Sequence, residues 1–449
     1  MVITTSLFII SFGLELEGYF RARPRLLYNI SLVNLQSVDP LITYFDSRGL
    51  LNVKLGDENI KLISRVDLID NAVWGYNIRG ASDAPLAQVI SFNDIVGKEV
   101  PPIKIKRLYL DIRTKIGAIM AGFMPSHFGL GMYVNSGDSI YNDYGDTYAR
   151  IAFATKPFGK DSNLITAIFF DKVVEGAVIQ EGSSDILDAD TDDLGIAALY
   201  NNDFWKGGFY STLRFQETSL QSKAFLIDAY FETKTKFYLA LELATLLGRF
   251  QVFQDQTLNI SSFGGLVRAG YKFSWIFPYA EFGYASPPGN NEFSLDTNRR
   301  GTELKGFRFH PDYDPALILF NFIGGSKVSQ PVLKGFSNIL ESRSVFSAYY
   351  LKINNQIKVQ NAFVIPSLLL AFDSKNSKFL GVEPDLEIRN KLLSEKREEG
   401  KESDYNLFLS LRMGLLIPGK QLKEVERPGE QGTKESPVFG IVGLIGYEF

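Results

Sequence analysis

The sequence predicts an all-β protein that forms one transmembrane antiparallel β-barrel of about 18 strands, within a range of 16–18. Three observations support this prediction. Apolar and polar residues alternate with a period of two, most alternating runs have 9 to 14 residues, and short and long connections alternate along the chain. A strand needs about 9–11 residues to cross a bilayer, whereas strands of soluble proteins commonly have about 5–6.

The alternation is clearest in the first expected strand. Leu14, Leu16 and Phe20 point to one face, and Arg21 and Arg23 point to the other. A soluble sandwich would bury the apolar face against a second sheet, whereas a membrane barrel turns it to lipid and the polar face to the lumen. The length of the runs favours the barrel. The expected strands are 14–27, 47–55, 59–70, 103–114, 116–124, 147–156, 163–172, 194–202, 206–216, 223–233, 235–247, 263–273, 275–285, 342–353, 355–367, 378–391, 404–416 and 437–449.

The connections support the same fold. Bacterial barrels have short periplasmic turns and long extracellular loops, and the expected short turns, such as 56–58 and Asn354, all fall on one side. The exceptions are a short outer connection at 217–222 and a charged inner one at 394–404. Residues 235–247 also fit a buried helix. The long outer connections are 28–46, 71–102, 125–146, 173–193, 248–262, 286–341 and 417–436.

The two ends of the chain have distinct patterns. We interpret the apolar residues 1–13 as a signal-peptide remnant, the alternative being the start of the first strand, and 14–449 as one barrel. The last ten residues alternate up to Tyr447 and Phe449, with apolar side chains on one parity. The terminal aromatic resembles the signal that the outer-membrane barrel assembly machinery recognises, so we expect these two residues to form the assembly signal.

Basic residues of the first four strands share the lumen-facing parity, and closure of the barrel brings the last strands next to them. Guanidinium groups stay charged and donate hydrogen bonds to anions, so this arc would attract anionic solutes. The alternative is that the inward charges pair across neighbouring strands. The expected solute path comprises Arg21, Arg23, Arg25, Arg65, Arg107, Tyr109, Arg113 and Arg412. Inward carboxylates are expected at Asp228, Glu232, Glu242, Glu281, Glu383, Asp385 and Glu387.

The connection 286–341 has 56 residues, which is long for a plain loop. Its apolar stretch, 315–325, would be unfavourable in water, so we expect the loop to fold into the lumen as a constriction or to pack against the rim. The expected constriction residues are His310, Asp312, Tyr313 and Asp314. The alternative role for the two aspartates is in turns or helix caps beside Pro311 and Pro315.

Several motifs resemble those of a family of large bacterial outer-membrane β-barrel proteins that is distantly similar to alginate-export-type porins. They are EGYFRARPRLLYN (17–29), MPSHFGLG (124–131), DYGDTYARIAF (143–153), FHPDYDPALILF (309–320) and LGVEPDLEIRNKL (380–392). The resemblance implies an 18-stranded barrel and transport. Ala149 departs from the pattern, because a charged residue is expected before Arg150.

Composition narrows the functional classes. The formal net charge of −4 does not favour a nucleic-acid partner, and the chain has no cysteine. Its two histidines, His127 and His310, have no metal-site spacing. We therefore expect no cofactor, no metal and no enzyme; a surface enzyme dependent on His127 is the weakest option.

We expect a porin-like channel in the bacterial outer membrane for hydrophilic solutes, with anions or saccharides as candidates. The alternative is a structural barrel that docks partners of an envelope complex. Expected partners are membrane lipid, lipopolysaccharide, the barrel assembly machinery and small solutes; the sequence names no protein partner.

Overall fold

The computed structural model describes ten stretches of the chain: 13–29, 41–75, 103–172, 191–217, 221–253, 256–289, 301–322, 344–394, 406–423 and 436–449. The expected signal-peptide remnant and the charged inner connection lie almost wholly outside these residues. So do parts of the long outer connections. Among the described residues, no helix has the length and hydrophobicity of a membrane span.

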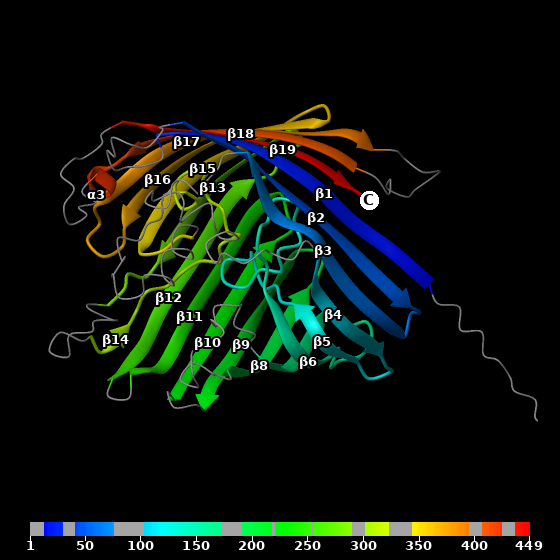
Figure 1. Cartoon of the computed structure of the whole chain (residues 1–449). Helices are drawn as coiled ribbons and strands as arrows, with labels where there is room; N and C mark the ends of the chain where they lie inside the picture. The colour runs from blue at the N-terminus through cyan, green and yellow to red at the C-terminus, as the bar shows by residue number, and fades with distance from the viewer. Residues whose placement is uncertain are drawn as a thin grey trace, which may run out of the picture.

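Eighteen long strands form a closed antiparallel ring, because each pairs with its neighbours in the sequence and β1 also pairs with β19 (Figure 1). This confirms the predicted barrel and strand number. A two-residue strand, β14 (Glu303–Leu304), adds to β12 in parallel, and α3 (Lys420–Lys423) is a single helical turn. The long strands are β1 (Gly13–Tyr28), β2 (Leu41–Gly56), β3 (Ile60–Gly75), β4 (Lys104–Arg113), β5 (Ala118–Pro125), β6 (Thr147–Thr155), β7 (Leu164–Lys172), β8 (Thr191–Asn201), β9 (Trp205–Glu217), β10 (Gln221–Thr233), β11 (Phe237–Phe253), β12 (Gln256–Tyr271), β13 (Ile276–Ala285), β15 (Ala348–Val359), β16 (Ala362–Asp373), β17 (Phe379–Ser394), β18 (Asn406–Pro418) and β19 (Val438–Glu448).

The two faces of each strand differ in polarity and exposure, as the alternation predicts. On β19, Ile445 is 53% exposed and Tyr447 is 42% exposed, whereas the intervening parity buries Leu444. Rows of outward apolar side chains recur around the ring, including Phe123, Ile168 and Leu351. Large apolar side chains exposed in this pattern are stable against hydrocarbon and unfavourable against water.

The last residue helps to close the ring. Phe449 and Gly18 of β1 exchange two backbone hydrogen bonds, of 2.8 Å and 3.0 Å. A Cβ atom at Gly18 would lie 2.9 Å from the Phe449 ring and 2.4 Å from the Leu50 carbonyl oxygen. The expected assembly residue Phe449 therefore lies in the seam between the first and last strands, and the absence of a side chain at Gly18 makes room for it.

Two predicted connections are wrong. The turn expected at Asn354 lies at Gln360 and Asn361, where Val359 pairs with Ala362 and Gln360 has a positive φ of 53°. Asn354 is instead a buried lumen-facing residue within β15. The long connection expected at 248–262 shrinks to 254–255, because β11 and β12 both continue beyond the predicted ends. Residues 235–247 contribute to strand β11, not to a helix.

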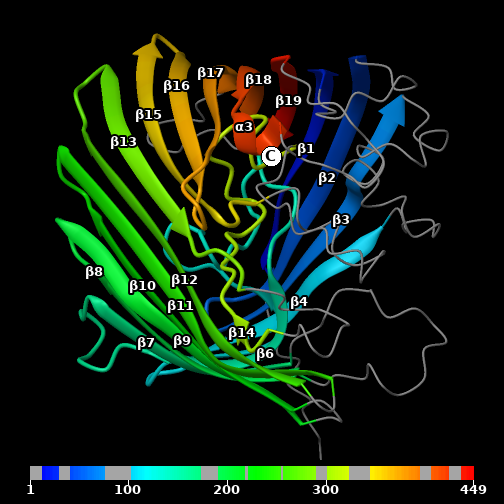
Figure 2. The same ribbon diagram turned by 90° about the vertical axis from the view of Figure 1, so that its left-hand side faces the viewer.

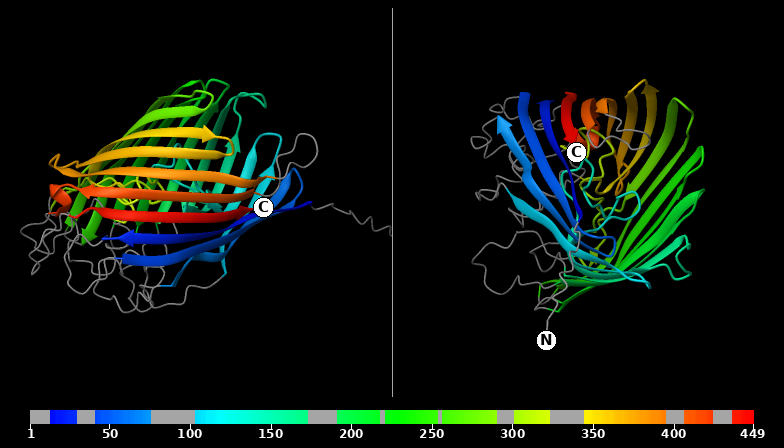
Figure 3. Two further views of the ribbon diagram at one scale, coloured as in Figure 1. Left: turned by 90° about the horizontal axis from the view of Figure 1, so that it is seen from above. Right: turned by 90° about the vertical axis from the view of Figure 1, so that its right-hand side faces the viewer.

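Two segments run inside the ring of strands, as the view along the barrel shows (Figure 2). The first inserted segment, 126–146, connects β5 to β6. The second, 301–322, belongs to the long connection between β13 and β15. The views from above and from the opposite end place both segments within the same ring (Figure 3).

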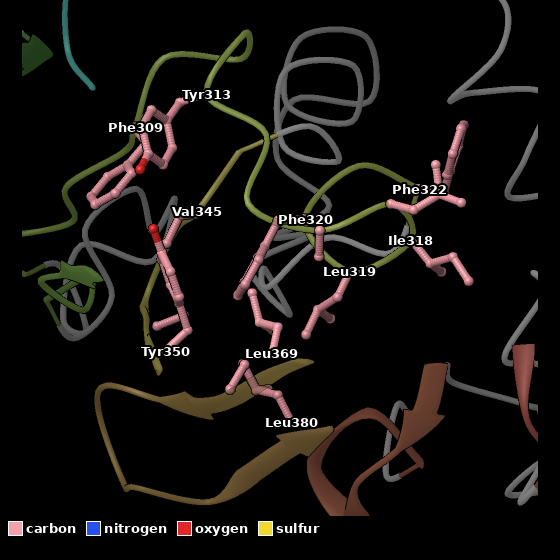
Figure 4. Packing of buried hydrophobic residues seen from close by; sticks show 14 of the residues in the cluster. Phe309, Tyr313, Ile318, Leu319, Phe320, Phe322, Val345, Tyr350, Leu369 and Leu380 are labelled. Carbon is pink, nitrogen blue, oxygen red and sulfur yellow. The ribbon is translucent and has the colours of Figure 1, made fainter. Parts of the chain in front are cut away.

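The largest hydrophobic core lies inside the barrel, between the second inserted segment and the wall. Phe309, Phe320 and neighbouring side chains of the segment face Tyr350 of β15, Leu369 of β16 and Leu380 of β17 (Figure 4). These residues are almost completely buried. Burial of this apolar surface explains why the stretch around 315–322 does not remain in water outside the membrane.

Candidate functional site

A ladder of arginines on β1 faces the lumen and is held by two carboxylates. Arg23 lies 2.6 Å from Asp46 of β2 and 2.5 Å from Asp143 of the first inserted segment. Arg25 pairs with Asp46 at 2.5 Å, and Arg21 donates to Asp143. All five side chains are buried, so these guanidinium groups attach the inserted segment to the wall.

A second group of charges continues the ladder onto β3 and β4. Arg65 contacts Asp67 at 3.0 Å and Asp138 at 3.1 Å, and Arg107 contacts Asp138 at 2.7 Å. Arg48 of β2 pairs with Asp67 at 3.3 Å. Asp138 belongs to the first inserted segment, so here too the wall arginines bind a loop carboxylate.

The residues expected to form the solute path do not all lie along one open surface. Arg21 is completely buried in ion pairs, whereas Arg65 is almost completely buried but contributes to the lining of a second cavity. Arg113 lies at the end of β4, is mostly exposed and is 3.5 Å from Asp111. Tyr109 lines a cavity of about 500 Å³ near the periplasmic end, together with Arg107. A role in solute passage stays a prediction for these residues.

The expected constriction residues join the two inserted segments to each other. The Asp312 carboxylate accepts hydrogen bonds from the backbone N–H groups of Asp143 (2.7 Å) and Tyr144 (3.0 Å). The His310 N–H donates to the Met132 carbonyl oxygen at 2.6 Å. The two segments thus form one connected body inside the barrel.

The other two constriction residues bind the wall. Arg268 of β12 donates to the Tyr313 hydroxyl oxygen at 2.9 Å. Arg412 of β18 donates to Asp314 at 2.6 Å and to Asp385 of β17 at 3.0 Å. Every predicted constriction residue in the second segment therefore has a specific contact inside the barrel.

Carboxylates of the wall also hold the backbone of the segments. Glu383 of β17 accepts from the N–H groups of Ile318 (2.6 Å) and Leu319 (2.7 Å). Glu242 of β11 accepts from the N–H groups of Leu130 and Met132, the latter at 3.1 Å. Loop N–H groups that are buried inside a barrel need acceptors, and these carboxylates supply them.

Burial sets the ionisation of side chains on the inserted segments. Burial raises the pKa of Tyr133 to about 12 and raises the pKa of Tyr313 well above its usual value. Burial also acts to raise the pKa of Asp138, but the Arg107 guanidinium and hydrogen bonds outweigh it and lower that pKa overall. Near neutral pH both phenols are therefore neutral and Asp138 is charged.

A cavity of about 470 Å³ lies between the inserted segments and the wall formed by β12–β19 and β1. Its lining is polar and contains six cationic side chains and six carboxylates. Most of these charges pair within the lining, for example Arg389 with Glu387 at 2.5 Å and Arg268 with Glu281 at 2.5 Å. The charged lining residues are Arg23, Arg25, Arg268, Lys352, Arg389, Arg412, Asp143, Glu281, Asp312, Asp314, Asp385 and Glu387.

Lys352 of β15 is the exception in this lining. Its cross-strand neighbour is Glu281, whose carboxylate binds Arg268 and Tyr350 instead. Within the described residues, the Lys352 ammonium group has no hydrogen bond and no ion pair. The sequence contains a signal for this position: Lys352 lies between the outward-facing Leu351 and Ile353, so the alternation of the strand assigns it to the lumen.

Sequence reasoning missed the residues that complete the ion pairs of the ladder. Asp46 fell in a stretch expected to be a loop, and Asp143 is about 120 positions from the arginines that it binds. Ala149 stands where the family resemblance leads us to expect a charged residue. Arg150, the next residue, pairs instead with Asp171, its directly opposite neighbour on β7, at 2.6 Å.

Each histidine side chain accepts a hydrogen bond from a nearby backbone N–H group. His127 accepts a long hydrogen bond, 3.5 Å, from the Ser136 N–H, and His310 accepts from the Asp312 N–H at 3.1 Å. In the described ranges, no group of three His, Asp or Glu side chains is arranged as metal ligands.

Comparison with known proteins identifies the fold. No family model matches the sequence, and no curated protein matches it. Solved structures do match over almost the whole chain. OccK11 (OpdR) of Pseudomonas aeruginosa has 10% identity and a TM-score of 0.51, covering 98% of this chain and 96% of that one.

Two further structures are similar to the same extent. A BenF-like porin of Pseudomonas fluorescens Pf-5 has 9% identity and a TM-score of 0.53, and OccAB2 of Acinetobacter baumannii has 11% identity and a TM-score of 0.52. Each comparison covers 97% of this chain and 98% of the other. The chain therefore has the fold of a large outer-membrane barrel of the porin type.

Proposed function

We propose that the protein is a channel of the bacterial outer membrane through which small hydrophilic solutes diffuse. The observation that carries this proposal is the charged, polar cavity between the inserted segments and the wall of β12–β19 and β1. Such a lining stabilises water and polar solutes inside a barrel whose outer face is apolar. Passage requires no catalysis, cofactor or metal.

We further propose that the cavity favours anionic solutes. Lys352 supplies an ammonium group that forms no ion pair among the described residues, and Asn354 and Ser367 beside it can donate or accept hydrogen bonds. A carboxylate on the solute would complement this ammonium. Supporting this idea, OpdK of Pseudomonas aeruginosa, a similar barrel with a TM-score of 0.50, has been solved with vanillate, an aromatic carboxylate. Saccharides are the second candidate.

Several finer predictions remain proposals. The likeness to alginate-export-type porins rests on the sequence motifs, because the similar structures named above are Occ-type and BenF-like proteins. We propose that lipid and lipopolysaccharide cover the outer face and that the assembly machinery recognises Tyr447 and Phe449. A scaffolding barrel would differ from a channel in conducting no ions.

Filling the cavity with a large side chain should block passage. Ser367 of β16 lines the cavity, so Ser367→Trp is expected to remove most of the single-channel conductance in planar bilayers. Leu368→Trp is the matched control, because the next residue on the same strand points to the outer face. A wild-type protein without conductance, or equal conductance of the two variants, would contradict the proposed route.

The charge of Lys352 should set ion preference. Lys352→Gln removes a lumen-facing ammonium group that forms no ion pair among the described residues, so the reversal potential in a KCl gradient is expected to shift toward cation preference. Lys358→Gln is the control, because Lys358 lies on the same face of β15 but is exposed near the end of the strand and outside the cavity lining. If both variants shift the potential equally, the preference comes from the general charge of the protein and not from the cavity.

A further inference from the structure

Most of the described short turns of the barrel lie together at one end. This end carries the start of β1 and the C terminus, and short turns of bacterial barrels face the periplasm (Figure 3, right). Five consecutive turns, 114–117, 156–163, 202–204, 234–236 and 272–275, constitute what we call the rim sector. Hydrogen bonds connect the turns to neighbouring residues: Thr155 to Ile116, Asn201 to Asn163, Lys234 to Phe204, and Lys272 to Lys236.

The rim sector exposes large apolar side chains at its tips. Phe158 is 81% exposed, Ile116 74% and Phe204 69%, which are the highest values among the large apolar residues that the structure describes. Phe273 and Trp275 are also more than half exposed. Phe273 shares the outward parity of β12 and packs against the exposed Tyr271 ring, so it extends the apolar outer surface of the barrel toward the depth of the headgroup region.

Lysines accompany the apolar tips in the sequence. The rim sector contains six lysines and two aspartates. Within the described residues, the ammonium groups of Lys115, Lys160 and Lys236 take part in no ion pair or hydrogen bond. By contrast, the turn 57–59 on the other side of the same end carries Asp57 and Glu58 and no lysine. Compared with the turn 57–59, the rim sector therefore carries an excess of positive charge.

We infer that the rim sector binds anionic phospholipid headgroups of the periplasmic leaflet. The apolar tips would enter the interface, and the lysines beside them would bind phosphate groups, since long basic side chains extend from apolar surface to charged headgroups. A lysine near an anionic membrane surface favours binding by about fivefold. The complementary charge and the continuity with the lipid-facing surface point to a lipid rather than to a soluble protein. This inference does not depend on channel activity.

Fluorescence of Trp275 tests the inference. The full chain with Trp74→Phe and Trp205→Phe retains Trp275 as its single tryptophan. It is reconstituted in phosphatidylcholine vesicles that contain a fixed fraction of brominated phosphatidylglycerol or brominated phosphatidylcholine, and circular dichroism verifies the β-barrel. We expect brominated phosphatidylglycerol to quench Trp275 more strongly. Equal quenching by the two lipids would overturn the inference and leave a soluble partner as the occupant.

Charge variants separate the rim sector from basic residues elsewhere. In the single-tryptophan protein, Lys234→Gln with Lys236→Gln is expected to lower the excess quenching severalfold. Lys375→Gln with Lys378→Gln, in the turn at the opposite end between β16 and β17, should leave it unchanged. A second measurement avoids the tryptophan changes: phosphatidylglycerol should raise the unfolding temperature of the wild type, and Lys156→Gln with Lys160→Gln should lower this increase. An undiminished increase in that variant would also overturn the inference.

Discussion

Replacing Asp143 by alanine is expected to destabilise the protein by about 3–5 kcal/mol, because the change removes a carboxylate that two buried guanidinium groups share. Arg21 and Arg23 both bind this side chain, and all three groups are buried. The loss is measured as a shift of the urea unfolding midpoint of the reconstituted protein.

The same segment offers a matched control. Asp138 also binds two wall arginines, Arg65 and Arg107, but its side chain is 55% exposed. Solvent reaches the Asp138 carboxylate, and Arg65 keeps Asp67 as a second partner, so Asp138→Ala is expected to cost only about 1 kcal/mol or less. Equal effects of the two substitutions would show that burial of the β1 ladder does not stabilise the inserted segment.

Replacing Asp312 by alanine is expected to separate the two inserted segments. The carboxylate is the acceptor for the N–H groups of Asp143 and Tyr144, so its loss leaves these groups without that partner. We expect a larger and noisier single-channel conductance, since segments that move independently open the lumen more often.

A graded substitution tests the cause of that effect. Asp312→Asn keeps one side-chain oxygen that can accept one of the hydrogen bonds, so its conductance should lie between those of the wild type and Asp312→Ala. If both variants conduct like the wild type, the contact between the segments does not control the lumen.

The strands were predictable because a membrane barrel places each residue against one of two contrasting environments. In the first strand, Leu14, Leu16 and Phe20 alternate with Arg21 and Arg23, and this pattern indicates which side chains face lipid and which face the lumen. Strand ends were less predictable. The polar residues Asn354 and Asn355 resemble a turn in sequence, yet they lie within β15, where Asn354 faces the polar interior.

The lumen was predictable only in part. Parity assigned the arginines of β1 to the interior, but it could not identify Asp143, which lies on an irregular segment far along the chain. Ion pairs between a strand and an inserted loop depend on the path of that loop, and a local pattern does not contain this information. The sequence predicted that the segment with Asp312 and Asp314 folds into the lumen or packs against the rim, and it lies inside the barrel. The sequence did not predict the partners of these two carboxylates, which are the Asp143 N–H group and Arg412.

In each strand, residues of one parity face lipid and residues of the other face the lumen, and cysteine labelling tests this division directly. The chain has no cysteine, so Ser367→Cys and Leu368→Cys each introduce a single thiol on adjacent positions of β16. In lipid vesicles, a membrane-impermeant maleimide should label Cys at 367 and spare Cys at 368. Fast labelling at 368 with protection at 367 would contradict the barrel orientation and the proposed channel.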